Sequence, residues 1–191
     1  MTFATARTAR PDLDDGVVRL RRWALDDLAC VRAASREGII PEGTTVPAAY
    51  TDEAGRQFIE RQWHRTTDGQ GWSSAIASVE TGEALGCAVL LLRPQDGVAG
   101  IGYWLVPAAR GLGYASRAVA LLTGWALAGD GAALTRVEAW VEPGNVASSR
   151  VLESCGYHLE GRLRSFLALP SRRADVLVYS RIHSDPPVRG R

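Results

Sequence analysis

This sequence of 191 residues has few of the side chains from which metal sites and disulfide frameworks are built. Its cysteines and histidines are spread along the chain without a Cys-x-x-Cys pair: Cys30, Cys87, Cys155, His64, His158 and His183. Such spacing fits neither a zinc site nor a disulfide framework, so we expect no bound metal. Unpaired cysteines also favour a reducing, cytoplasmic location.

The sequence also lacks a long apolar run and a large charge of one sign. No run approaches the roughly 20 apolar residues of a membrane span, and the N-terminus lacks the apolar core of a signal peptide. The formal net charge of +1 argues against nucleic-acid binding through a basic face. We therefore expect neither a membrane nor a nucleic acid as partner. One domain over residues 17–183 is expected between loose tails at 1–16 and 184–191.

The most informative segment is a strand, a glycine loop and a helix in direct succession. An apolar run at residues 101–106 predicts the strand, which Pro107 ends because proline has no N–H group. Helical spacing of apolar residues predicts a helix from about Tyr114 to Leu127. Between them, Arg-Gly-Leu-Gly occupies residues 110–113. Free N–H groups, glycines and an arginine suit a diphosphate. A plain turn that needs glycine at positive φ is the alternative.

Two familiar diphosphate motifs do not fit this loop. A P-loop requires glycine followed by lysine, and no Gly-Lys pair occurs in the chain. A dinucleotide-binding fingerprint requires a third glycine, and Ser116 stands at that position. A nucleotide-binding enzyme of the Rossmann type is therefore disfavoured.

Alternating apolar residues and turn residues predict the other elements. The predicted strands cover residues 17–23, 72–80, 85–93, 101–106, 134–141, 157–164 and 174–182, with a loop at 38–50 and a helix at 145–155. A helix that crosses over between 101–106 and 134–141 makes these two strands parallel. The order predicts an α/β (mixed α+β) domain in which helices cover both faces of a mixed sheet.

Two segments resemble known motifs. Arg110-Gly111-Leu112-Gly113-Tyr114-Ala115 resembles the coenzyme A loop R/Q-x-x-G-x-G/A of the GCN5-related N-acetyltransferases, or GNAT superfamily. The segment from Asn145 to Tyr157 is similar to N-x-A-S-x-R-V-L-E-x-x-G-F/Y of the RimJ/RimL-like branch, which acetylates N-termini of ribosomal proteins. The resemblance covers about residues 17–182. It implies a central, mostly antiparallel sheet of about seven strands, splayed between two parallel central strands.

The resemblance also implies acetyl-CoA as co-substrate. The implied cofactor-binding residues are Trp104, Leu105, Val106, Arg110, Gly111, Leu112, Gly113, Tyr114, Ala115, Asn145 and Ser148. The backbone of the first three would line the gap that holds the pantetheine arm, and the N–H of Val106 or of a neighbour would be the oxyanion donor. Purely structural alternatives are sheet core for Leu105 and Val106, a surface salt bridge for Arg110 and a helix N-cap for Asn145.

Catalytic roles are the least determined. By resemblance to RimL-type enzymes, Ser148 is the candidate general acid for the departing thiolate, and a hydrogen bond at the helix start is its alternative. Glu138 lies mid-strand beside the gap and is a candidate general base, unless it pairs with Arg136 on an outer face. Glu160 is a second candidate, and free amine in solution makes a dedicated base dispensable.

The sequence departs from its relatives at two places. Leu152 stands where many members have a tyrosine that acts as the general acid. This difference favours Ser148 as the general acid here. Ser116-Arg117 replaces a threonine-glutamate pair, which leaves the polarity of the acceptor open.

The leading hypothesis is an N-acetyltransferase that acts on a protein N-terminal or small-molecule amine by direct attack in a ternary complex. Drug acetylation, a larger donor such as succinyl-CoA, and a non-catalytic CoA-binding sensor module are alternatives. A homodimer is left open.

Overall fold

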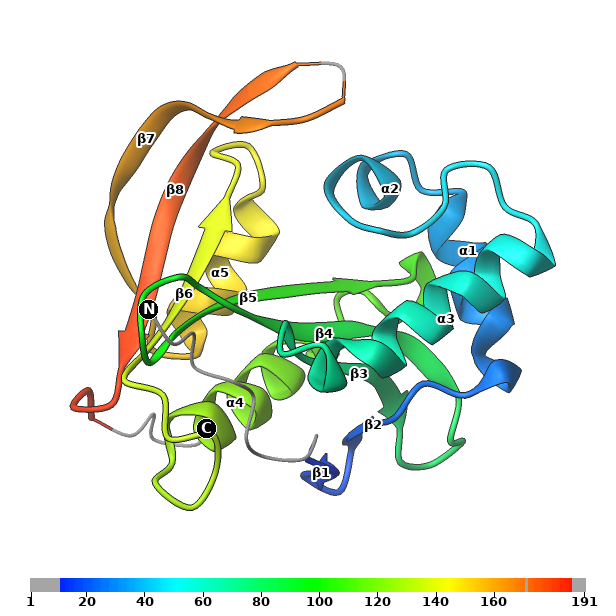
Figure 1. Ribbon diagram of the computed structural model, residues 1–191, viewed down its shortest axis with the longest axis horizontal. Coiled ribbons are helices and arrows are strands. Elements are labelled where there is room, and N and C mark those ends of the chain that lie inside the picture. The colour runs from blue at the N-terminus through cyan, green and yellow to red at the C-terminus, as the bar shows by residue number, and fades with distance from the viewer. Residues whose placement is uncertain (1–10, 171, 187–191) are drawn as a thin grey trace.

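The central feature of the computed structural model is one eight-stranded sheet in the order β1-β2-β3-β4-β5-β6-β8-β7 (Figure 1). The structure describes residues 11–170 and 172–186. The strands are β1 (Leu13–Asp14), β2 (Val18–Arg21), β3 (Gly71–Ser78), β4 (Ala84–Leu92), β5 (Val98–Leu105), β6 (Arg136–Val141), β7 (His158–Ala168) and β8 (Arg173–Ile182). Neighbouring strands are antiparallel except β5 and β6, which are parallel as predicted.

Helices occupy the connections between these strands. They are α1 (Leu28–Ser35), α2 (Ile39–Gly43), α3 (Asp52–Thr67), α4 (Tyr114–Leu127) and α5 (Val146–Ser154), with 3-10 turns η1 (Leu25–Asp27) and η2 (Pro107–Ala109). Helix α4 makes the crossover between β5 and β6, which is why these two strands run in the same direction. Among the described residues, no helix is both long and apolar enough to cross a membrane.

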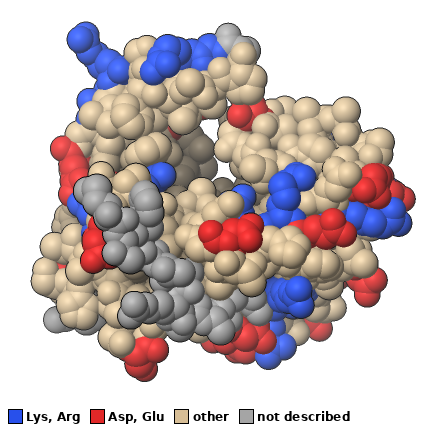
Figure 2. Space-filling model, viewed as in Figure 1, with Lys and Arg blue, Asp and Glu red and all other residues tan. Residues whose placement is uncertain are grey.

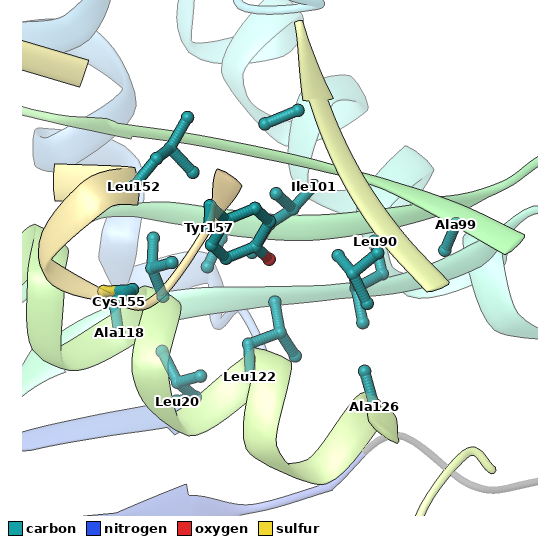
Figure 3. Close-up of a cluster of buried hydrophobic side chains, with 14 of the residues drawn as sticks. Leu20, Leu90, Ala99, Ile101, Ala118, Leu122, Ala126, Leu152, Cys155 and Tyr157 are labelled. Atoms are coloured by element: carbon teal, nitrogen blue, oxygen red, sulfur yellow. The ribbon is translucent and has the colours of Figure 1, made fainter. Parts of the chain in front are cut away.

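One hydrophobic core lies where α4 packs on the sheet. Ala118, Leu122 and Ala126 recur every four residues on α4 and are fully or almost fully buried. Figure 3 shows them turned toward the sheet residues Leu20 and Leu90. This helical spacing places one apolar stripe on the sheet, as the sequence predicts.

A second core, formed by α1 and α3 with the sheet, is rich in aromatic side chains. Trp23 and Phe58 meet edge to face with 5.4 Å between ring centroids, and Trp104 of β5 packs 6.1 Å from Trp23. All three are at most 9% exposed. The Trp104 side chain is therefore committed to packing, which leaves only its backbone for any other role.

The two parallel strands separate along their length. Their pairing covers only Val98–Gly100 with Arg136–Glu138, yet β5 continues to Leu105 and β6 to Val141. The end halves of β5 and β6 therefore have no hydrogen bonds between them. The splay that the resemblance implies is thus a feature of this sheet.

Several predicted boundaries need correction. Leu13 and Asp14 pair with Leu20 and Arg19, so the expected N-terminal tail contains a strand and the sheet has eight strands rather than seven. Residues 39–43 form α2 inside the predicted loop, because proline is tolerated in the first turn of a helix. The predicted strand 101–106 begins earlier, at Val98, and ends at Leu105. The outer parts of both expected tails, residues 1–10 and 187–191, lie outside the described residues.

Candidate functional site

The glycine loop opens α4 with a row of backbone donors. Gly111 and Gly113 adopt φ of +77° and +81°, the left-handed region that glycine enters without strain. A Cβ atom added to either would meet nothing within 4 Å. The first helical bond of α4 joins Arg117 N–H to Gly113 O, and within the described chain the N–H groups of residues 111–113 donate no backbone hydrogen bond. These donors and the positive end of the helix dipole suit an anion.

The side chain of Arg110 turns away from this row of donors. Its Nε donates to Leu105 O at 3.1 Å, and its Nη1 lies 3.1 Å from Glu37 Oε2 in the segment between α1 and α2. The salt-bridge alternative is therefore the arrangement in this structure. The side chain of Arg110 remains 45% exposed and lies beside the loop.

The edge of β5 that faces the gap presents the N–H of a neighbour of Val106, and not that of Val106 itself. Val106 N–H donates to Leu85 O at 2.9 Å, so it points to β4 and is occupied. In an antiparallel ladder, alternate residues point their N–H groups to opposite sides. The β4–β5 register therefore turns the N–H groups of Tyr103 and Leu105 toward the splayed side. Leu105 replaces Val106 as the nearest donor along the gap.

On the other side of the gap, Asn145 caps α5. Its Oδ1 accepts the N–H of Ser148 at 3.1 Å, so the predicted N-cap is present. The hydroxyl of Ser148 makes no such bond at the helix start. It lies 2.8 Å from the hydroxyl of Tyr103 on β5, and the Tyr103 hydroxyl also lies 3.2 Å from Ser148 O.

Tyr103 is a residue that the sequence analysis missed. Burial raises its pKa to about 12, although the hydrogen bond to Ser148 acts in the opposite direction. In the sequence, the only sign of it is a polar hydroxyl in the otherwise apolar segment 101–106. Its partner is 45 residues away, so the contact depends on the register of β5 against α5.

Both candidate bases are held by arginines. Glu138 Oε1 accepts from Arg93 Nε at 2.9 Å, and its second oxygen is 3.7 Å from Arg136. Glu160 accepts from Arg136 Nη1 at 2.8 Å and from Ser180 Oγ at 2.7 Å. The hydrogen bonds from Arg136 and Ser180 lower the pKa of Glu160 to about 2, which makes it a weak base at neutral pH.

The gap opens between two parts of the surface. Figure 2 shows a hollow between the side that carries β7, β8 and α5 and the side that carries α2. Arg172 links these sides, with Nη2 at 2.7 Å from Glu142 and Nε at 3.7 Å from Glu42. A pocket of about 400 Å³ lies beside this link and is lined by Ser35, Arg36, Gly38, Pro41, Glu42, Ala48 and Pro170.

The arrangement brings three chemical functions to one place. The loop at residues 111–113 offers donors to a diphosphate, and the open edge of β5 offers hydrogen bonds to an extended polar arm. The hydroxyls of Ser148 and Tyr103 lie between β5 and α5, beyond the point where pairing stops. The remaining predicted residues lie around the loop: Leu112 is exposed, and Tyr114 and Ala115 are half-buried at the start of α4.

Comparisons with known proteins agree with this geometry. The acetyltransferase (GNAT) domain family matches residues 18–158. The uncharacterized N-acetyltransferase p20 of Bacillus licheniformis is 33% identical over 126 residues, which are 65% of this chain and 70% of p20. RimJ of Mycobacterium smegmatis, solved with CoA-disulfide, aligns with a TM-score of 0.76 and 24% identity over 87% of this chain and 82% of its own. The microcin C7 self-immunity acetyltransferase MccE, solved with acetyl-CoA and AMP, aligns with a TM-score of 0.75 and 21% identity over 88% and 93%.

Proposed function

Because this chain belongs to the GNAT acetyltransferase family, we propose that it moves an acetyl group from acetyl-CoA to a primary amine by direct attack in a ternary complex. The observation that carries the proposal is the combination of a left-handed glycine loop at the start of α4 with the open edge of β5. Coenzyme A contains a diphosphate joined to a pantetheine arm. The glycine loop suits the diphosphate, and the open edge of β5 suits the arm.

The loop would hold the diphosphate through the N–H groups of residues 111–113 and of the first turn of α4. Arg110 would add its charge after exchanging Glu37 for the diphosphate. The pantetheine arm would pair with Leu105, which it meets first as it runs from the loop along β5. Two protein neighbours of the same fold, RimJ with CoA-disulfide and MccE with acetyl-CoA, support this choice of ligand.

The thioester would lie farther from the loop than Leu105, near Tyr103, whose hydroxyl contacts Ser148. The N–H of Tyr103 faces the gap and would donate to the carbonyl oxygen as it gains negative charge. When the amine nitrogen attacks, a C–N bond forms and the C–S bond breaks, so that the electron pair stays on sulfur. Ser148 Oγ would give its hydrogen to that sulfur.

Deprotonation of the amine is the step for which the described residues provide no strong general base. The carboxylate of Glu160 has a pKa of about 2, and that of Glu138 is held by Arg93. We therefore propose that the amine enters as its free base, with its proton lost to water. Glu138 remains a hypothetical base that a single substitution can test.

A protein N-terminal amine is the proposed acceptor. The similarity to RimJ supports it, and so does the hollow between α2 and the β7–β8 hairpin, which is open to the outside (Figure 2). The free and buried state of Cys30, Cys87 and Cys155 supports a cytoplasmic location, because reduced thiols are usual there.

The first test is the melting temperature of the protein with acetyl-CoA, NAD or ATP at saturating concentration. A ligand at about 100 times its Kd adds about 2.7 kcal/mol to the free energy of unfolding, which raises the melting temperature visibly. A rise with acetyl-CoA alone is the expected result, and a rise with NAD alone would contradict the proposal.

The second test is acetyl transfer to a panel of peptides with different first residues, followed by mass spectrometry. The chain contains no lysine, so acetylation of the enzyme's own side-chain amines cannot contribute to the signal. Peptides with a blocked N-terminus are the matched control. Transfer to small amines without transfer to any peptide would overturn the acceptor assignment.

A further inference from the structure

We propose that Tyr103 is a positioning residue for Ser148: it donates its hydroxyl hydrogen to Ser148 Oγ and so directs the serine's own hydrogen toward the leaving sulfur. The inference rests on the role of Ser148 in the proposed function. It adds a residue from the central strand β5 to the proton path.

The distances between the two residues are compatible with this direction of donation. A serine hydroxyl has one hydrogen and two acceptor sites, and a phenol has one hydrogen. The contact between the hydroxyls is 2.8 Å, and either oxygen can be its donor. The contact to Ser148 O, in which only Tyr103 can donate, is 3.2 Å, which is longer than the usual range for a hydroxyl donor. The phenol hydrogen therefore makes the shorter bond when it points to Ser148 Oγ. When Tyr103 donates to Oγ, the serine hydrogen is left for another acceptor, and the open gap is where such an acceptor can come.

The backbone around both groups limits their movement. Asn145 holds the N–H of Ser148, and Ser148 lies in the first turn of α5. Tyr103 lies in the middle of a strand whose neighbour Ala88 is in register with it. The Tyr103 hydroxyl therefore reaches Ser148 from a fixed direction. Its hydrogen bond favours one orientation of the Ser148 hydroxyl.

The environment keeps Tyr103 in its donor form. Burial raises the pKa of the phenol to about 12, so it stays protonated throughout the pH range in which an acetyltransferase would be assayed. In the transfer step, sulfur takes the Ser148 hydrogen as the C–S bond breaks. Tyr103 stabilises the negative charge that grows on Oγ, and the proton released by the amine returns to Oγ through water. The products are an amide and a thiol.

The test is a double-mutant cycle of Tyr103→Phe and Ser148→Ala, with kcat and KM measured for acetyl-CoA. We expect Tyr103→Phe to lower kcat by roughly tenfold to a hundredfold with little change in KM. In the Ser148→Ala background, the same change should cost nothing further, because the group through which Tyr103 acts is gone. An equal loss in both backgrounds, or no loss in either, would overturn the inference.

Tyr157→Phe is the matched control. Tyr157 is also buried in the core of α4 and α5, where its hydroxyl bonds to Thr123 Oγ1 at 2.7 Å, away from Ser148. Tyr157→Phe removes the same hydroxyl oxygen as Tyr103→Phe does. It should therefore lower the melting temperature without lowering kcat. A Tyr157→Phe enzyme with the same loss of kcat would show that core destabilisation is the cause.

Different results would contradict the proposed function and this inference. Absence of stabilisation by acetyl-CoA in the wild-type protein would overturn the function. Normal kcat in Ser148→Ala would overturn the role of the serine and the inference together, while acetyl transfer itself would stand.

Discussion

The guanidinium of Arg110 lies 3.1 Å from the carboxylate of Glu37, and this contact joins the glycine loop to the segment between α1 and α2. The two residues are 73 positions apart in the sequence. In the proposed complex, Glu37 would therefore compete with the diphosphate for the same cation. Binding at the loop would release Glu37, whose neighbours Arg36 and Gly38 line the pocket beside α2.

Replacing Glu37 should tighten the binding of acetyl-CoA. In Glu37→Gln, no ion pair of Arg110 has to be broken before it can contact the diphosphate. An exposed ion pair contributes up to about 1 kcal/mol, so its absence should favour binding by up to that amount. We expect the Kd for acetyl-CoA, measured by calorimetry, to fall by about twofold to fivefold. Glu53→Gln is the control, since Glu53 is an exposed carboxylate on α3 that pairs with Arg56. An unchanged or higher Kd in Glu37→Gln would contradict the competition.

Two glycines of the same segment should respond in opposite ways to alanine. Neither Gly113 nor Gly124 has an atom within 4 Å of an added Cβ, but only Gly113 has positive φ. Gly113→Ala should lower the free energy of unfolding by about 1 kcal/mol, because alanine is strained in the left-handed region. Gly124→Ala, inside α4, should raise it by about 0.5–1 kcal/mol. Urea unfolding measures both changes in the free energy of unfolding. Changes of the same sign in the two variants would contradict the left-handed conformation of Gly113.

Acid should weaken the protein partly through Glu160. Arg136 and Ser180 hold the pKa of this carboxyl at about 2, below its ordinary value of 4.5. A lowered folded-state pKa gives stability that is fully present above pH 4.5 and is lost as the pH falls toward 2. Glu160→Gln should therefore flatten the decline of the melting temperature between about pH 4.5 and 2. A parallel decline in both proteins would refute this contribution.

Glu138→Gln tests whether the chain has a dedicated general base. A general base contributes about a hundredfold to ten-thousandfold to a rate. Because Arg93 holds Glu138, we expect kcat at saturating amine to fall by less than about tenfold, with the pH profile still set by the amine. A loss of a hundredfold or more, with the acidic limb of the profile removed, would restore Glu138 as the base.

Local signals in the sequence were enough for the parts of the site built from neighbouring residues. The helix after the glycine loop covers Tyr114–Leu127, the range predicted, because glycine and an apolar stripe mark its start and its face. Asn145 acts as the N-cap, as its position before the α5 helix suggests. In both cases the interacting groups are within a few residues of one another.

Contacts between distant segments could not be predicted in this way. The free N–H at the end of β5 is that of Leu105 rather than Val106, since the β4 register decides which alternate residues face the gap. The pairing of Tyr103 with Ser148 depends on the packing of α5 against β5. The short strand β1 escapes notice for another reason: two residues are too few to show a period.

The divergence of β5 and β6 places an unpaired backbone edge in the interior of a sheet. An edge of this kind on an outer strand invites another chain to add itself and begin aggregation. Here the edge belongs to a strand in the interior of the sheet, between β4 and β6, and α5 contacts it through Ser148 and Tyr103. The sheet thereby keeps the hydrogen-bonding capacity of a strand edge at a place away from its two outer strands, where edge-to-edge association between proteins occurs.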